Sequence, residues 1–384
     1  MPATKFKNTL YRLALPIIAP SCGCHPISSV SGHSLFSYKE LTSILRRHHV
    51  LGSAVLVSSG QNRSLICSCS DLAGHTARED TYFRVASITK MATSLLCMHL
   101  ADLCILDLHL PVVNYLEFTV PDSSLEKITL LHLLSHTSGL IDPPGLESYL
   151  ENNAPFTDFI SDAARFTPGS SFHYSNLGFG LVGCILESVL KKPVSHIFRE
   201  YLFEPLHMNS TLEGCNLPVE KIMPVTRILP YRKGHDVVLT VLGSKPLVNA
   251  DPLRHYGHTA GSMYTDVLSL EKLLNVFIHN KGHYVSEHAA ELMCREHAFY
   301  GELSPTLSYG LGMLRINDSG ISDSLILGHQ GFAYGCADGA FWEKNSGRIM
   351  IMLNGGSSEA RSGRLGLLNR DLLRWAFRKE LPLW

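Results

Sequence analysis

The stretch Ser87-Ile88-Thr89-Lys90, which opens the apolar run of residues 91–105, decides how the rest of this 384-residue chain is interpreted. The run predicts a buried helix over residues 87–105, with a serine at its start and a lysine one turn later. The positive end of the helix dipole favours developing negative charge on such a serine. Positions three apart share a helix face, and apolar surroundings lower the pKa of a lysine. Ser87 is therefore a candidate nucleophile and Lys90 its candidate base.

Three further Ser-x-x-Lys strings begin at Ser124, Ser188 and Ser269, so the string alone carries little weight. The copy at Ser87 differs because it alone starts a helix apolar enough to be buried. One alternative stays open at this point, in which Ser87 only caps the helix and Lys90 is an ordinary surface lysine.

A second element, Tyr174-Ser175-Asn176, is expected in a loop just ahead of an apolar helix. A phenol held near an ammonium has a lowered pKa, so Tyr174 could pass protons between the nucleophile and the leaving group. The amide of Asn176 could hold Lys90 or a substrate carbonyl. The alternative is an asparagine N-cap beside a packed tyrosine.

A third element, His329-Gln330-Gly331-Phe332, precedes two strand-like runs. A glycine on an edge strand lets substrate lie against the backbone, and the N–H of Phe332 could then join that of Ser87 in an oxyanion hole. His329, only partly charged at neutral pH, is a candidate substrate contact, and so is Asn354 further along the chain. The alternative is a hairpin glycine beside a surface histidine.

The order of elements predicts the fold class. Strand-like segments lie at both ends of the chain and helical segments lie between them. The expected strands are 51–58, 63–70, 311–316, 335–342 and 348–353, and the expected helices are 38–49, 87–105, 125–135, 156–165, 176–190, 194–203, 262–279 and 362–378. We therefore expect an α+β fold, in which an antiparallel sheet made from both chain ends is flanked by helices and carries an inserted all-helical region. Residues 1–35 are expected to be a poorly ordered leader, residues 36–86 plus 259–384 the sheet domain, and residues 87–258 the mainly helical domain.

Composition excludes several classes of protein. Lysine plus arginine number 33 and aspartate plus glutamate 34, so no basic excess indicates a nucleic-acid partner. No apolar run reaches the length of a membrane span. The ten cysteines are scattered like small hydrophobic residues, which favours a reducing compartment and a cytoplasmic location. Export stays the alternative, because basic residues precede the short apolar run 13–19.

Metal and cofactor sites are not expected. His132 and His136 are four apart, but no glutamate follows His132 as zinc peptidases require. The cysteine pairs 22/24 and 67/69 lack a matching second pair at zinc-finger distance. The chain contains no glycine-rich phosphate loop.

Taken together, the three elements resemble the serine β-lactamase-like superfamily. The similar branch contains class C β-lactamases, D-aminopeptidases, D-alanyl-D-alanine carboxypeptidases and related esterases, and the resemblance covers about residues 35–384. Supporting strings are Phe83–Lys90, Leu133–Leu140, Thr259–Tyr264 and Tyr309–Gly312. The usual third motif of the lactamases is Lys-Thr-Gly, and here it is His-Gln-Gly, more like the D-aminopeptidases and esterases.

The resemblance implies a β-lactamase/transpeptidase-like fold and a division of roles. Ser87 would form an acyl-enzyme, Lys90 and Tyr174 would share acid–base work, and Asn176 would position Lys90 and the substrate. The expected activity is hydrolysis of a small amide, peptide or ester, with doubtful penicillin turnover. The alternatives are a catalytically silent ligand-binding protein on the same fold and a β-lactamase proper. The natural acyl group, the choice between hydrolysis and acyl transfer, and the oligomeric state are not readable from the residues.

Overall fold

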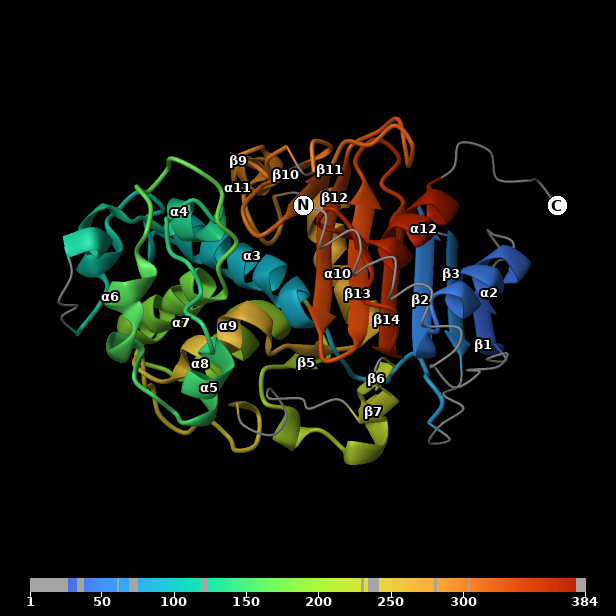
Figure 1. Cartoon of the computed structure of the whole chain (residues 1–384), viewed down its shortest axis with the longest axis horizontal. Helices are drawn as coiled ribbons and strands as arrows, with labels where there is room; N and C mark the ends of the chain where they lie inside the picture. The colour runs from blue at the N-terminus through green and yellow to red at the C-terminus, as the bar shows by residue number, and fades with distance from the viewer. Residues whose placement is uncertain are drawn as a thin grey trace.

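The computed structural model describes residues 27–32, 38–60, 62–68, 75–118, 123–228, 231–233, 242–279, 282–302 and 304–377. Within these ranges, an antiparallel sheet with covering helices lies at one side of the molecule, and most of the remaining helices gather at the other (Figure 1). The α+β fold expected from the element order is confirmed.

The main sheet has nine strands in the order β1-β3-β2-β14-β13-β12-β11-β10-β9. Its strands are β1 Ile27–Gly32, β2 Leu51–Ser59, β3 Asn62–Ser68, β9 Ala298–Phe299, β10 Leu307–Tyr309, β11 Leu314–Ile316, β12 Ile326–Ala333, β13 Cys336–Glu343 and β14 Ile349–Gly356. The predicted hairpin of β2 and β3 is confirmed, with Gly60 in the left-handed region at the turn. The two ends of the chain join where β14 pairs with β2, from Ile349 opposite Ser58 to Gly356 opposite Leu51.

Both faces of the sheet are covered, and alternate residues of the central strands supply two cores. Helices α2 Tyr38–Arg47 and α12 Leu367–Ala376 pack on one face, where Val55, Val57 and Met350 contribute to the core. Helix α10 Val267–Ile278 covers the other face, where Leu56 and Ile351 of the sheet contribute to the core. This second core is continuous with the interior of the helical region, so sheet and helices share one apolar cluster.

Helix α3, residues Thr89–Asp102, runs from the sheet into the helical region (Figure 1). It is buried almost all round, as its uniformly apolar sequence predicts. The other helices are α4 Leu130–Leu134, α5 Leu146–Glu151, α6 Ile160–Ala163, α7 Asn176–Leu190, α8 Val194–Phe198, α9 His258–Gly261 and α11 Glu287–Cys294, and the short strands are β4 Phe83–Arg84, β5 Ser210–Thr211, β6 Thr226–Ile228, β7 Tyr231–Lys233, β8 Tyr264–Thr265, β15 Arg361–Ser362 and β16 Leu365–Gly366. None of the helices in the described ranges has the length and apolar character that a membrane crossing requires.

Several predicted bounds were wrong. Residues 27–32, within the expected leader, form β1 and pair with β3, which would otherwise be the edge of the sheet. Residues 1–26 and 33–37, with Cys22 and Cys24, lie outside the described ranges, as does Cys69. The helix expected from residue 262 begins at Val267, because Asp266 caps it and Tyr264 and Thr265 pair in β8. The closing helix begins at Leu367 instead of residue 362, after β15 and β16. The division into domains stays a prediction.

Candidate active site

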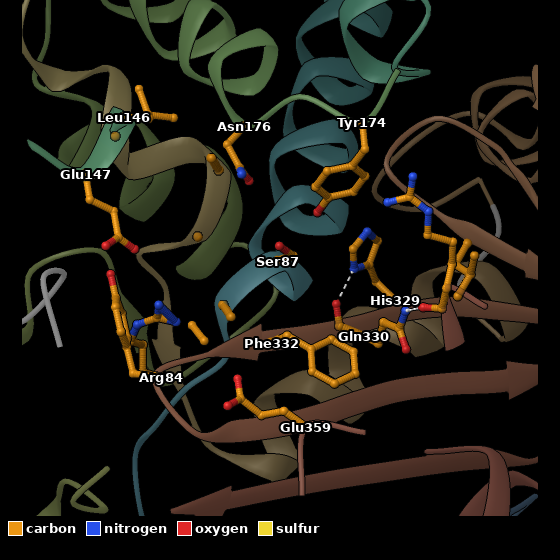
Figure 2. Close-up of a pocket in the computed structure, with 18 of the residues that line it drawn as sticks. Arg84, Ser87, Leu146, Glu147, Tyr174, Asn176, His329, Gln330, Phe332 and Glu359 are labelled. Atoms are coloured by element: carbon orange, nitrogen blue, oxygen red, sulfur yellow. Dashed lines mark hydrogen bonds between the residues drawn. The ribbon is translucent and has the colours of Figure 1, made fainter. Parts of the chain in front are cut away.

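A cleft of about 620 Å³ lies where the start of α3 and the loop before α7 approach the edge of β12. Ser87, Tyr174, Asn176, His329 and Phe332 all line it, so one cavity brings together five of the seven predicted site residues (Figure 2). The remaining two, Lys90 and Gly331, are not among the lining residues. Sequence reasoning could not show this convergence, because the three motifs lie up to 245 residues apart in the chain.

Ser87 is held by a strained turn. It belongs to the 3-10 segment Ala86–Ile88, and the preceding Ala86 has a left-handed backbone with φ of 47°. Such a conformation costs a residue with a side chain about 1–3 kcal/mol, so the surrounding structure must impose it. Thr89 does so, because its hydroxyl donates to the Ala86 carbonyl at 2.7 Å and accepts from the Met263 N–H at 3.2 Å. The half-buried Ser87 consequently faces the cleft at the N-terminus of α3.

Gly331 is required by this turn, a role that we did not expect from the sequence. A Cβ at this position would lie 2.3 Å from the Val85 carbonyl oxygen and 3.2 Å from the Ala86 Cβ. The glycine therefore lets β12 pack against the turn that carries Ser87, and its expected role toward substrate stays a prediction. It sets the distance between Ser87 and the β12 backbone.

In the part of the chain that the structure describes, the edge of β12 beside the cleft has no neighbouring strand after residue 328. β13 pairs with β12 over residues 326–333, whereas β11 pairs only with residues 326–328. Backbone groups of residues 329–333 that point away from β13 therefore have no ladder partner in β11, although the Gln330 carbonyl accepts from His329. Phe332 lies on this stretch and lines the cleft.

The Lys90 side chain is surrounded by three oxygens. Its Nζ lies 2.7 Å from Asn176 Oδ1, 2.7 Å from the Ala260 carbonyl oxygen and 3.2 Å from Ser87 Oγ. The first two are acceptors only, whereas a hydroxyl both donates and accepts. A neutral amine has two hydrogens and one lone pair. As an ammonium, Lys90 donates to all three oxygens; once neutral, it gives its two hydrogens to Asn176 and Ala260, which leaves the lone pair for the hydroxyl of Ser87.

The charge state of Lys90 suits this arrangement. The side chain is fully buried, and burial lowers its pKa to about 7, with a nearby aspartate, Asp142, acting in the opposite direction and Arg84 in the same one. A large fraction of Lys90 is therefore neutral at physiological pH. The alternative of an ordinary surface lysine is wrong.

Asp142, which sequence reasoning missed, holds Asn176 in place. Its Oδ2 accepts from Asn176 Nδ2 at 2.8 Å, and its Oδ1 accepts from the Leu177 N–H at 2.8 Å and from Ser175 Oγ at 3.0 Å. Ser175, and not Asn176, caps α7 by accepting from the Gly178 N–H. The asparagine side chain is therefore committed to Lys90 and Asp142.

Tyr174 lies beside the lysine, with Lys90 Nζ 5.0 Å from its ring centroid. Its hydroxyl hydrogen-bonds with Ser87. We expected a lowered phenol pKa, and this was wrong. Burial raises the pKa of Tyr174 well above its usual value of 10, with Tyr300 adding to the rise, and the bond to Ser87 offsets only part of it. Tyr174 is consequently a neutral phenol, packed 4.2 Å from the ring of buried His136, which accepts the Ser175 N–H.

His329 is neutral and fully engaged. Burial, followed by the nearby Lys90, lowers its pKa to about 3. Its Nδ1 donates to the Gln330 carbonyl at 2.6 Å, the contact dashed in Figure 2, so its Nε2 accepts from the Tyr309 hydroxyl at 2.8 Å. The partial charge we expected is absent, and neither nitrogen is left for a substrate. Asn354 is likewise no substrate contact, because its buried amide bonds Ala337, Asp338 and Gly356.

The remaining cleft wall has two characters. Leu146, Leu150 and Leu242 form an apolar end, where the last two pack against Gly257. Charged side chains occupy other parts of the wall, and these are Arg84, Glu147, Arg227, Glu359, Arg361 and Arg364. Sequence reasoning identified none of them, since no short motif marks a residue that reaches a cleft from a distant loop. Among the described residues, no group of histidine, cysteine and acidic side chains is arranged to hold a metal ion.

Known proteins resemble this chain over most of its length. The Beta-lactamase family model matches residues 40–372. Among curated relatives, a beta-lactamase of Yersinia enterocolitica is 24% identical over 52% of this chain and 51% of its own. The D-alanyl-D-alanine-carboxypeptidase/endopeptidase AmpH of Escherichia coli (strain K12) is 30% identical over 42% and 44%, and the esterase EstB of Burkholderia gladioli 26% over 78% and 83%. The chain thus spans about half the length of the first two.

Solved structures support the fold. EstCE1, a hydrolase with promiscuous acyltransferase activity, has a TM-score of 0.69 at 19% identity, covering 88% of this chain and 98% of its own. The D-amino acid amidase of Ochrobactrum anthropi SV3 has a TM-score of 0.68 at 22% identity, covering 88% and 96%.

Proposed function

Because the chain belongs to the Beta-lactamase family, we propose that it is a serine hydrolase that cleaves a small amide, peptide or ester through an acyl-enzyme. One observation carries the proposal. Lys90 Nζ lies 3.2 Å from Ser87 Oγ, and its other two partners, Asn176 Oδ1 and the Ala260 carbonyl oxygen, can only accept, so that the neutral amine has its lone pair left for Ser87. This is the geometry that a general base requires, at a pKa near physiological pH.

In the acylation step, Ser87 Oγ attacks the substrate carbonyl carbon and its proton moves to Lys90 Nζ. The oxyanion is stabilised by the backbone N–H groups of Ser87 and Phe332, the second of which lies on the stretch of β12 that β11 does not pair with. Tyr174, a neutral phenol in contact with Ser87, donates a proton to the leaving group and regains one from Lys90. Water then attacks the acyl-enzyme along the reverse route, which releases the acid and restores Ser87.

We propose that an ester or amide, and not a penicillin, is the preferred substrate. A lysine in the third motif would supply a cation for a substrate carboxylate, whereas His329 is neutral and its two nitrogens are occupied. The esterase EstB is a relative over most of both chains. A β-lactamase proper stays the second candidate, because four arginines in the cleft wall could receive a carboxylate. A catalytically silent protein is less well supported, since Ser87, Lys90 and Tyr174 are all in contact. The scattered cysteines support a cytoplasmic location.

The test is labelling with a fluorophosphonate, followed by mass identification of the modified residue. We expect Ser87 of the folded protein to be labelled, at a rate that rises as pH passes through about 7 and Lys90 loses its proton. In parallel, p-nitrophenyl esters should be hydrolysed with weak or absent penicillin turnover. Unlabelled Ser87, or labelling unchanged in Lys90→Ala, would count against the hydrolase. Efficient penicillin or cephalosporin turnover would reverse the order of the two substrates.

A further inference from the structure

We propose that Asp142 is a positioning residue, which sets the orientation of the Asn176 amide and thereby aims the lone pair of Lys90 at Ser87. The inference rests on the proposed function, because it concerns the efficiency of the same base. Asp142 touches none of the reacting atoms: it orients Asn176 through a hydrogen bond and acts on Lys90 through its charge.

The orientation of an asparagine side chain is a choice between two states that differ by a half-turn. In one state the oxygen faces Lys90, and in the other the NH₂ group does. Asp142 decides between them, because a carboxylate can only accept. Its Oδ2 lies 2.8 Å from Asn176 Nδ2, which forces the NH₂ group toward Asp142 and the oxygen toward Lys90 Nζ at 2.7 Å.

The carboxylate is itself held by the backbone. The N–H of Leu177 donates to Asp142 Oδ1 at 2.8 Å, and the Ser175 hydroxyl adds a second bond at 3.0 Å. The loop that carries Asp142 is anchored just before it, where the Ile141 N–H donates to the Ala163 carbonyl at 2.8 Å. These bonds fix the position of Asp142 Oδ1 at the start of α7. The other oxygen, Oδ2, then points at the Asn176 side chain.

The same carboxylate acts on Lys90 through its charge. Its field opposes the effect of burial and so raises the pKa of the lysine, which would otherwise fall further. Removing the charge should therefore lower the pH at which Lys90 becomes a base. This shift reports the charge of Asp142, whereas the labelling rate at alkaline pH, where Lys90 is neutral in every variant, reports the orientation of Asn176.

Asp142→Asn is the informative substitution, because it preserves shape and removes one acceptor. The new amide must turn its oxygen to the Leu177 N–H, and its NH₂ group then faces the NH₂ group of Asn176. Asn176 relieves this clash by turning over, which places its NH₂ group against Lys90 and occupies the lone pair that Ser87 needs. We expect fluorophosphonate labelling of Ser87 to slow by about 100-fold, the scale of a lost general base. The acid limb of the pH–rate profile should move to lower pH.

The double variant Asp142→Asn with Asn176→Asp restores every donor–acceptor pair and the total charge. The amide introduced at position 142 would then donate to the carboxylate introduced at position 176, and that carboxylate accepts from Lys90 Nζ. Labelling should recover at least about tenfold relative to Asp142→Asn at alkaline pH. Because the carboxylate now touches the lysine, the acid limb should lie above that of the wild type. Ser175→Ala is the matched control. It removes another bond to Asp142 and the cap of α7, so it should lower the unfolding temperature and leave the acid limb in place.

The outcomes separate the two proposals. If wild-type Ser87 is never labelled, the proposed hydrolase fails. If wild-type Ser87 is labelled and Asp142→Asn is labelled as fast as the wild type at alkaline pH, Asp142 has no positioning role. The same follows if the double variant is as slow as Asp142→Asn at every pH. Should Asp142→Asn not fold, the double variant decides by itself, since retained labelling with a raised acid limb supports the proposal and any other profile overturns it.

Discussion

Gly331→Ala tests the claim that a glycine on β12 sets the distance between the nucleophile and the oxyanion-binding backbone. The added Cβ would lie 2.3 Å from the Val85 carbonyl oxygen, and ordinary contact begins at 3.4 Å. The strand and the turn must therefore separate by roughly 1 Å, because the atoms that the Cβ meets belong to the Val85 backbone and cannot turn aside as a flexible side chain would. A hydrogen bond of about 2.9 Å lengthened by that amount is no longer a hydrogen bond.

Two magnitudes follow for Gly331→Ala. Overpacking of this kind lowers the free energy of unfolding by about 1–3 kcal/mol. Loss of one oxyanion donor slows acylation by about 100- to 1,000-fold. Urea unfolding measures the first effect and fluorophosphonate labelling of Ser87 the second, at a temperature where both proteins are folded.

Gly178→Ala is the matched control for this experiment. Gly178 lies in α7, close to the same site, and a Cβ there would meet only ordinary contacts at 3.6 Å or more. In a helix, alanine in place of glycine stabilises by about 0.5–1 kcal/mol, so this variant should be at least as stable as the wild type and label at the same rate. Wild-type labelling by folded Gly331→Ala would refute the reasoning, since the turn could then move without loss of the oxyanion site.

Two further predictions concern the acid–base groups. Lys90→Met should abolish labelling of Ser87 yet raise the free energy of unfolding below pH 7, by up to about 5 kcal/mol, because the wild type buries an ammonium there. Wild-type stability should accordingly rise between pH 7 and 10.5, where the unfolded chain holds the Lys90 proton and the folded chain has released it, and urea unfolding of the variant should lack this slope. Tyr174→Phe should slow the hydrolysis of alkyl esters by about 100-fold or more, and it should spare p-nitrophenyl esters, whose leaving group needs no proton. Equal losses for the two kinds of ester would argue against proton donation by Tyr174.

Much of the fold could be predicted from local patterns. The hairpin of β2 and β3, the apolar helix α3 and the amphipathic α2 each carry a periodicity or a turn signal within a few residues. Predictions went wrong where the structure of a segment depends on a partner segment far away in the chain. β1 is rich in serine and has no strand pattern of its own, and it is a strand because β3 offers it an unpaired edge.

The site divides in the same way. Residue type together with local context made Ser87, Lys90 and Tyr174 candidates, because the serine and the lysine open an apolar helix and the tyrosine lies just before another. The charge states needed the structure, since desolvation depends on every atom nearby. Burial raises the pKa of Tyr174, where we had expected the ammonium to lower it, and it leaves His329 neutral.

The sequence by itself determined the covalent chemistry available, the order of the elements and the three motifs that place this chain in its family. Tertiary structure alone decided how those groups are aimed. Asp142, 34 residues from Asn176, orients the amide that directs Lys90, and Gly331, 244 residues from Ser87, brings β12 against the turn of the nucleophile. Hydrogen bonds and steric contacts act over a few ångströms of space, so their partners are set by packing and not by separation along the chain.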